Sequence, residues 1–219
     1  MLARVLAVAA VAGVVLYASI VAAASETRPA PAAPGPATRT GFTSVSVPRR
    51  VVYVIDASAA MAPIFDHVRA ELKKSISGLK TAQPFNVVFF QDAKAIPLHN
   101  DGLLIATPDN KRSVEAFAKG VRAAGASDPL AALELAFEPR PDLIYFMAAG
   151  PFPDADAVIA RVRELSRGGG TKIAAISIGA PNEKLAATLK RIADETDGTY
   201  SHVAPEQLKD SSTQPATRP

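Results

Sequence analysis

The chain has 219 residues, of which 48% are hydrophobic and 21% are charged, with a formal net charge of +3. This composition is typical of a soluble domain, and it leaves room for one domain of ~100–150 residues once both ends of the chain are set aside. Cysteine and tryptophan are absent and the basic residues are scattered, which excludes disulfides and thiolate sites and argues against a nucleic acid partner.

The first 24 residues are uncharged apart from Arg4 and mostly apolar, and the run ends with Ala22, Ala23 and Ala24 before Ser25. Two interpretations stay open. The alanines fit a signal peptide that is cleaved after an A-x-A site. The run from Val5 to Ala24 also has the ~20 residues of a transmembrane helix, which predicts an uncleaved anchor. Both interpretations predict an exported protein. It would be secreted or periplasmic, or it would be tethered to the membrane by the N-terminal segment with its domain outside the cytoplasm.

Two further segments are predicted to lie outside the folded domain. Residues 25–47 are rich in proline and alanine, which predicts an extended linker. Residues 209–219 are polar and are expected to form a disordered tail. A single domain is therefore predicted over residues 48–208.

Within this domain, apolar runs alternate with amphipathic segments. Strands are predicted at residues 50–56, 85–90, 95–98, 142–147, 172–178 and 198–203, and helices at residues 62–79, 109–121, 129–137, 154–167 and 182–196. Strands that are apolar on both faces and separated by helices indicate an α/β fold, doubly wound, with a mostly parallel central sheet covered by helices on both faces, as in Rossmann-like folds.

The first predicted helix carries an apolar stripe, because Ile64, Val68, Leu72 and Ile76 recur at steps of four. Asp109 is predicted to be the N-cap of the second helix. Asp128 is predicted to cap the third, with Pro129 at its first position.

Four stretches resemble the von Willebrand factor type A family. Residues 51–61 (VVYVIDASAAM) resemble its Asp-x-Ser-x-Ser signature at the end of a first strand, and residues 125–133 (GASDPLAAL) resemble its second loop. Residues 142–153 (DLIYFMAAGPFP) resemble the strand and loop that end in Thr-Asp-Gly, and residues 198–201 are similar to its last strand. The resemblance implies a metal-ion-dependent adhesion site (MIDAS) for a divalent cation, and protein or matrix partners.

This sequence departs from the family pattern at two of five positions. Asp56 and Ser58 are retained, and Ser127 stands for the threonine with its hydroxyl kept. Ala60 and Ala149 replace the second serine and the second aspartate. Because Mg²⁺ requires six oxygen ligands at ~2.0–2.1 Å, Asp56, Ser58 and Ser127 are predicted to form a degenerate site with weak or no metal binding. No cofactor is expected, the alternative being weakly bound Mg²⁺ or Mn²⁺.

Other readings of these aspartates are structural. Asp56 at a strand end can accept loop N–H groups without any metal. Asp128 could supply a missing charge, but its predicted role is to cap a helix. Asp92, after the second strand, is the other candidate donor, and it is expected to be solvated.

The sequence thus predicts an exported, non-catalytic interaction domain with an unidentified protein partner, no nucleic acid partner, and a membrane contact only through an uncleaved N-terminal segment. The alternatives are a Mg²⁺-dependent adhesion module and a scaffold subunit of a cell-envelope complex. An enzyme is not expected, since the sequence offers Ser58 no base and His67, His99 and His202 form no paired ligand motif.

Overall fold

The computed structural model describes residues 49–207. The predicted signal peptide or anchor, the linker and the tail lie outside these residues. Within them, no helix is both long and apolar enough to cross a membrane.

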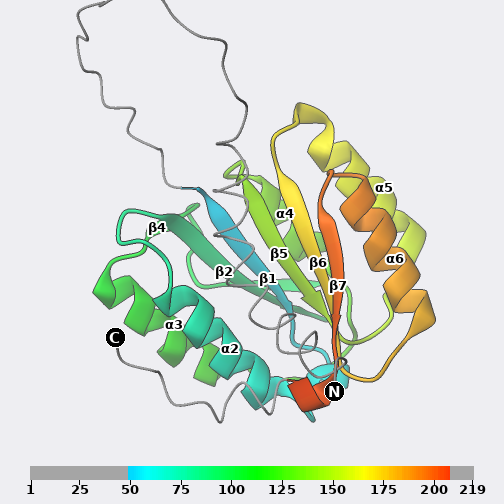
Figure 1. The fold of residues 1–219 in the computed structure, drawn as a ribbon, viewed down its shortest axis with the longest axis horizontal. Coiled ribbons are helices and arrows are strands. Elements are labelled where there is room, and N and C mark those ends of the chain that lie inside the picture. Colours follow the sequence, from blue (N-terminus) through cyan, green and yellow to red (C-terminus); the bar gives the residue numbers. More distant parts are fainter. Residues whose placement is uncertain (1–48, 208–219) are drawn as a thin grey trace, which may run out of the picture.

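The centre of the domain is a seven-stranded sheet with the order β3-β2-β1-β5-β6-β7, in which β4 also pairs with β2 (Figure 1). Strands β1, β2, β5, β6 and β7 run parallel, whereas β3 and β4 are antiparallel to β2. The bounds are β1 Val51–Asp56, β2 Pro84–Gln91, β3 Lys94–Pro97, β4 Leu104–Ile105, β5 Leu143–Ala148, β6 Lys172–Ile178 and β7 Thr199–Val203.

Helices cover both faces of this sheet (Figure 1). They are α2 Phe65–Ser77, α3 Pro108–Gly120, α4 Leu130–Phe137, α5 Ala155–Leu165 and α6 Glu183–Asp194, with short 3-10 helices η1 Ala59–Met61 and η2 Ser166–Gly168. Helices α2 and α3 contribute to one hydrophobic core, and α4, α5 and α6 to the other. The predicted doubly wound α/β fold is confirmed.

The two cores follow from the alternation of side chains along each strand. In β1, Tyr53 and Ile55 belong to the core under α2 and α3, whereas Val52 and Val54 belong to the core under α4, α5 and α6. Every residue of β1 is buried. A strand with two buried faces favours apolar residues at successive positions, which is why Val51 to Ile55 form a continuous apolar run before Asp56.

The predicted apolar stripe of the first helix is confirmed, since Ile64, Val68, Leu72 and Ile76 are all buried. The helix itself begins at Phe65 and not at residue 62. Ile64 has a φ of −125°, outside the helical range. The preceding segment makes shorter-range bonds instead, since the N–H groups of Met61, Ala62 and Ile64 each donate to the carbonyl three residues earlier, and the α-helical pattern starts only after them.

The predicted N-cap of α3 is wrong. Thr107 is the N-cap, because its hydroxyl accepts the N–H of Asn110 at 3.2 Å. Pro108 then occupies the first turn, where its missing N–H costs nothing. Asp109 lies inside the first turn. Strand β4 was not predicted, because a strand of two residues is too short to show an alternation of apolar and polar residues.

Candidate functional site

Loops from three parts of the chain meet at the carboxyl edge of the sheet. Strands β1 and β5 are parallel neighbours, with Ile55 opposite Met147, so they end side by side. Asp56 is the last residue of β1, and Ala149 follows β5 directly. Ser127 lies between α3 and α4. The structure therefore brings together the residues that the resemblance selected.

Gly150 lies against Ser58, Ala60 and Ser127 and shows that the three residues are close together. A Cβ built on Gly150 would lie 3.2 Å from Ala60 Cβ, 3.4 Å from Ser127 Cβ and 3.7 Å from Ser58 Oγ. All five family positions thus belong to one cluster. Gly150 packs so closely that a larger residue would push the loops apart. It is not among the site residues predicted from the sequence.

The Asp56 carboxylate is fully buried, with 0% of the residue exposed. Its Oδ1 accepts the backbone N–H of Ser58 at 2.7 Å. Its Oδ2 accepts the hydroxyl of Ser127 at 2.8 Å, and also the N–H groups of Ala149 at 3.1 Å and Gly150 at 3.4 Å. A buried charge is costly unless hydrogen bonds satisfy it, and here four donors from three loops do so.

Ser58 is the exception in this cluster. Its residue is 2% exposed, and its Oγ makes no hydrogen bond to any described residue. A buried hydroxyl without a partner costs ~1–3 kcal/mol. Ser58 Oγ is therefore the atom of the cluster whose hydrogen-bonding capacity the described residues do not satisfy.

The residues present do not fit the shell of a tightly held Mg²⁺ ion. Ala60 and Ala149 present methyl groups, and the Ser127 hydroxyl already donates to Asp56. Among residues 49–207, no group of three or more acidic or histidine side chains could hold a metal ion. Asp56 is the carboxylate of the cluster, and it already accepts hydrogen bonds from four donors. It therefore offers a hard cation little free negative charge.

Two nearby aspartates have structural partners. Asp128 Oδ1 accepts the N–H of Leu130 at 3.2 Å, but the N-cap of α4 is Pro129 and the helix begins at Leu130, so the predicted cap at Asp128 with Pro129 at the first helical position is wrong by one residue. Asp92 Oδ1 accepts the N–H of Ala126 at 2.7 Å, and the Asp92 N–H donates to the Ala126 carbonyl at 3.0 Å. Asp92 therefore holds the loop that carries Ser127 instead of being merely solvated.

Gly125 is required by this arrangement. Its φ is +73°, and a Cβ there would lie 2.2 Å from the Asp92 carboxylate oxygens. Only glycine adopts this conformation without strain and leaves room for the carboxylate. The loop that presents Ser127 thus depends on one glycine and one aspartate.

A second polar cluster links the last two strands. The Ser177 hydroxyl lies 2.8 Å from the hydroxyl of Tyr200 and 2.9 Å from His202 Nδ1. Ser177 is on β6, whereas Tyr200 and His202 are on β7. Sequence reasoning missed this cluster, because residues on neighbouring strands are far apart in the chain. Its hydrogen bonds join the edge strand β7 to β6. This cluster is separate from the one that contains Ser58.

The comparisons with known proteins agree with this geometry. The family profile described as "von Willebrand factor type A domain" matches residues 49–202, more than half of the chain. No curated protein matches the chain by sequence.

Solved structures share the fold at low identity. A von Willebrand factor type A protein from Catenulispora acidiphila is 23% identical with a TM-score of 0.63, and the match covers 75% of this chain and 41% of that one. The pilus adhesin SpaC from Lactobacillus rhamnosus GG is 11% identical with a TM-score of 0.63, covering 77% and 29%. The vWF domain of the pili tip protein Mfa5 from Porphyromonas gingivalis is 11% identical with a TM-score of 0.53, covering 80% and 99%. The chain thus matches less than half the length of the first two proteins.

Proposed function

The chain belongs to the von Willebrand factor type A domain family, and on this premise we propose that it is a non-catalytic protein-interaction domain that needs no bound divalent cation. The proposal extends to export from the cytoplasm, by way of the apolar N-terminal run. It leaves the partner protein unidentified.

One observation carries the cation-independent part of the proposal. In this chain, backbone N–H groups of Ala149 and Gly150 and the Ser127 hydroxyl converge on Asp56. These donors hold the three loops together in the way that a bound ion would. These hydrogen bonds support the proposal that the loops keep their shape without a cation and offer a partner a preformed surface.

The relatives favour an interaction role over catalysis. Two of the similar structures are, by their titles, a pilus adhesin and a pili tip protein, which supports a protein partner outside the cytoplasm. A serine nucleophile requires an adjacent base. Among the described residues, Ser58 Oγ has no hydrogen-bond partner of any kind.

A Mg²⁺- or Mn²⁺-dependent binding module is the second candidate. The observation that favours it is the buried, unpartnered Ser58 Oγ beside Asp56. A cation that displaced the loop N–H groups could use this oxygen, but it would have to replace the hydrogen bonds that satisfy the carboxylate.

Thermal unfolding of the full chain in a neutral detergent separates the two candidates. A ligand that binds only the folded state stabilises it by RT ln(1 + [L]/Kd). We expect the same Tm in EDTA and in excess Mg²⁺ or Mn²⁺. A rise in Tm that Asp56→Asn abolishes would establish the cation-dependent module instead.

The interaction role is tested by capture of envelope proteins on the immobilised chain. We expect the same proteins to be retained in EDTA and in Mg²⁺. Retention that EDTA removes would contradict cation independence, and the absence of any specifically retained protein would contradict the interaction role itself.

A further inference from the structure

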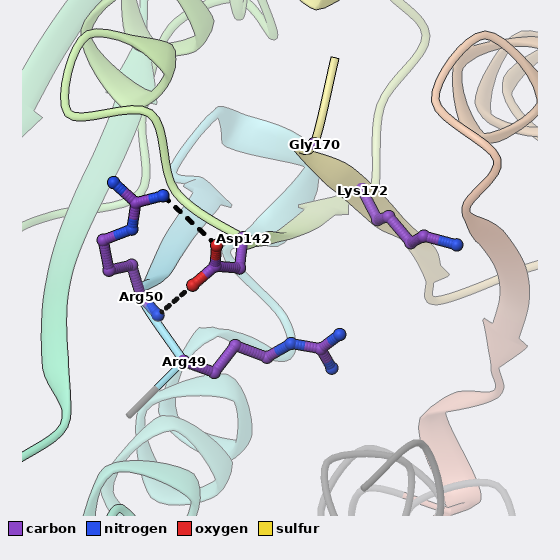
Figure 2. A pocket seen from close by; sticks show the side chains of 5 residues that line it. All are labelled: Arg49, Arg50, Asp142, Gly170 and Lys172. Atoms are coloured by element: carbon purple, nitrogen blue, oxygen red, sulfur yellow. Dashed lines mark hydrogen bonds and ion pairs between the residues drawn. The ribbon is translucent and has the colours of Figure 1, made fainter. Parts of the chain in front are cut away.

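A pocket lies at the amino edge of the sheet, opposite the Asp56 cluster. It has a volume of about 450 Å³ and is lined by Arg49, Arg50, Asp142, Gly170 and Lys172 (Figure 2). Arg49 and Arg50 precede β1, Asp142 precedes β5, and Lys172 begins β6. These three strands are neighbours and parallel, so their starting residues gather at one edge.

The single carboxylate of the pocket is already used. Asp142 Oδ2 accepts the backbone N–H of Arg50 at 2.7 Å, and its Oδ1 accepts the Arg50 guanidinium at 3.2 Å. The Asp142 N–H also donates to the Arg50 carbonyl at 2.9 Å. This reciprocal pair joins the start of β1 to that of β5, and it neutralises Arg50.

Two cations remain without an opposite charge. Among residues 49–207, neither Arg49 nor Lys172 forms an ion pair. Figure 2 shows both side chains extending away from the Arg50–Asp142 pair. The same residues of the chain contain 19 Lys and Arg and 19 Asp and Glu, so the excess of positive charge at this pocket is local.

The glycine loop before β6 contributes Gly170 to the wall of the pocket. Gly169 and Gly170 have φ values of +68° and +90°, and a Cβ on either would meet nothing within 4 Å. The loop is therefore open to solvent. The Gly169 N–H is already donated to the carbonyl of Ser166 at 2.8 Å, whereas Gly170 lines the pocket together with Arg49 and Lys172.

A small apolar hollow adjoins the cations. It has a volume of about 40 Å³, and Arg49 and Lys172 line it together with Leu143, Ile173, Ala174, Gly198 and Thr199. A free phosphate ion has no use for apolar walls. A phosphodiester carried on a glycerol backbone does, because its carbon atoms can occupy the hollow while its oxygens meet the cations.

The position of the pocket in the chain favours a lipid as the source. Arg49 is where the chain enters the described domain, 25 residues after Ala24, the last residue of the apolar N-terminal run. If that run anchors the protein, the chain leads from the membrane to this edge of the sheet. We propose that the pocket lined by Arg49, Gly170 and Lys172 binds the phosphate group of an anionic phospholipid. This proposal is independent of the proposed function of the Asp56 cluster.

Hydrogen–deuterium exchange of the full chain tests the proposal. The chain is mixed with an excess of nanodiscs made of phosphatidylcholine alone, or of phosphatidylcholine with phosphatidylglycerol. We expect amide exchange in residues 166–172 to slow roughly tenfold in the anionic discs, because cations near an anionic surface hold the loop against it. Arg49→Gln combined with Lys172→Gln should abolish the difference.

The control is the combination of Lys94→Gln and Lys184→Gln, two exposed lysines at the opposite edge of the domain. It removes the same charge and should leave the slowing intact. Equal exchange in both discs, or equal loss in the control, would overturn the proposal.

Two further arms distinguish the source of the anion. Inorganic phosphate or an acidic peptide is added to discs of phosphatidylcholine alone. We expect neither to slow the loop. If phosphate does so as well as phosphatidylglycerol, the pocket takes small phosphate ions and the lipid assignment is wrong; if only the peptide does so, the pocket is a protein contact.

Discussion

The hydroxyl of Ser127 lies 2.8 Å from Oδ2 of Asp56, although the two residues are 71 positions apart in the chain. The same oxygen also accepts two N–H groups from the loop after β5. Asp56 therefore acts as the fastening point of three loops at the carboxyl edge of the sheet. Its hydrogen bonds determine what this edge can do, and they lead to the first three predictions.

Removal of the Asp56 carboxylate should be strongly destabilising. Asp56→Ala leaves four donors without their acceptor, three of them backbone N–H groups, and we expect a loss of ~3–5 kcal/mol in the free energy of unfolding. Asp56→Asn keeps one carbonyl oxygen and should lose less. Chemical denaturation measures both. Asp66→Ala, at an aspartate whose side chain is 90% exposed, should change stability by only ~0–0.5 kcal/mol.

The two serines of the cluster should respond in opposite ways. Ser58→Ala removes a buried hydroxyl that has no partner among the described residues, and it should leave stability unchanged or raise it by up to ~1 kcal/mol. Ser127→Ala removes a donor to Asp56 and should cost ~1–3 kcal/mol. The two variants make the same chemical change, so each is the control for the other. A clear loss for Ser58→Ala would indicate a bound partner at that oxygen.

Restoring the two missing side chains should create a cation site. Ala60→Ser combined with Ala149→Asp returns a hydroxyl and a carboxylate to the cluster. In EDTA this variant should be less stable than the parent, because the new carboxylate lies beside Asp56 and like charges repel. Saturating Mg²⁺ at ~100 times its Kd should then stabilise it by ~2.7 kcal/mol. Calorimetric titration checks this, and Ala60→Ser alone, without the charge, should bind far more weakly.

Gly198 should tolerate no side chain. A Cβ built there would lie 2.0 Å from the carbonyl oxygen of Ile173, so β7 could not start beside β6 without a backbone shift. We expect Gly198→Ala to cost ~2–4 kcal/mol in unfolding experiments. Gly168→Ala is the matched control, because nothing lies within 4 Å of its Cβ position. Equal effects of the two substitutions would contradict this role.

The contact between α2 and α3 should make stability depend on pH in the acid range. Hydrogen bonds from Lys73 and Lys119, at 2.8 and 3.0 Å, lower the pKa of Glu115 from 4.5 to about 2. Because the folded-state pKa is the lower one, the folded form is favoured above pH 4.5 and this contribution is lost as the pH falls toward 2. Glu115→Gln should flatten that part of the stability curve. The side chain is exposed to solvent, so high salt should weaken the effect; Glu183→Gln is the control.

Local patterns were enough to predict most of the elements. The continuous apolar run of β1 and the stripe of α2 both reflect burial, and burial is written directly into residue type and spacing. The ends of the elements were less certain. The apolar stripe predicts that α2 starts at residue 62, but the N–H groups of Ala62 and Ile64 donate to carbonyls three residues earlier, so the α-helix starts at Phe65. The start of α3 was predicted at Asp109, whereas Thr107, two residues earlier and also of a type that caps helices, is the N-cap.

The sequence by itself determined the α/β fold, the resemblance to the type A family, and the loss of two oxygen ligands at Ala60 and Ala149. Only the tertiary structure decided which groups satisfy the buried Asp56 carboxylate. The donors to Asp56 from Ala149 and Gly150 are backbone N–H groups more than 90 positions away. Every residue except proline carries such a group, so no residue type marks the ones that will be used. Their direction is set by how β1 and β5 pack side by side, and that is a property of the folded chain.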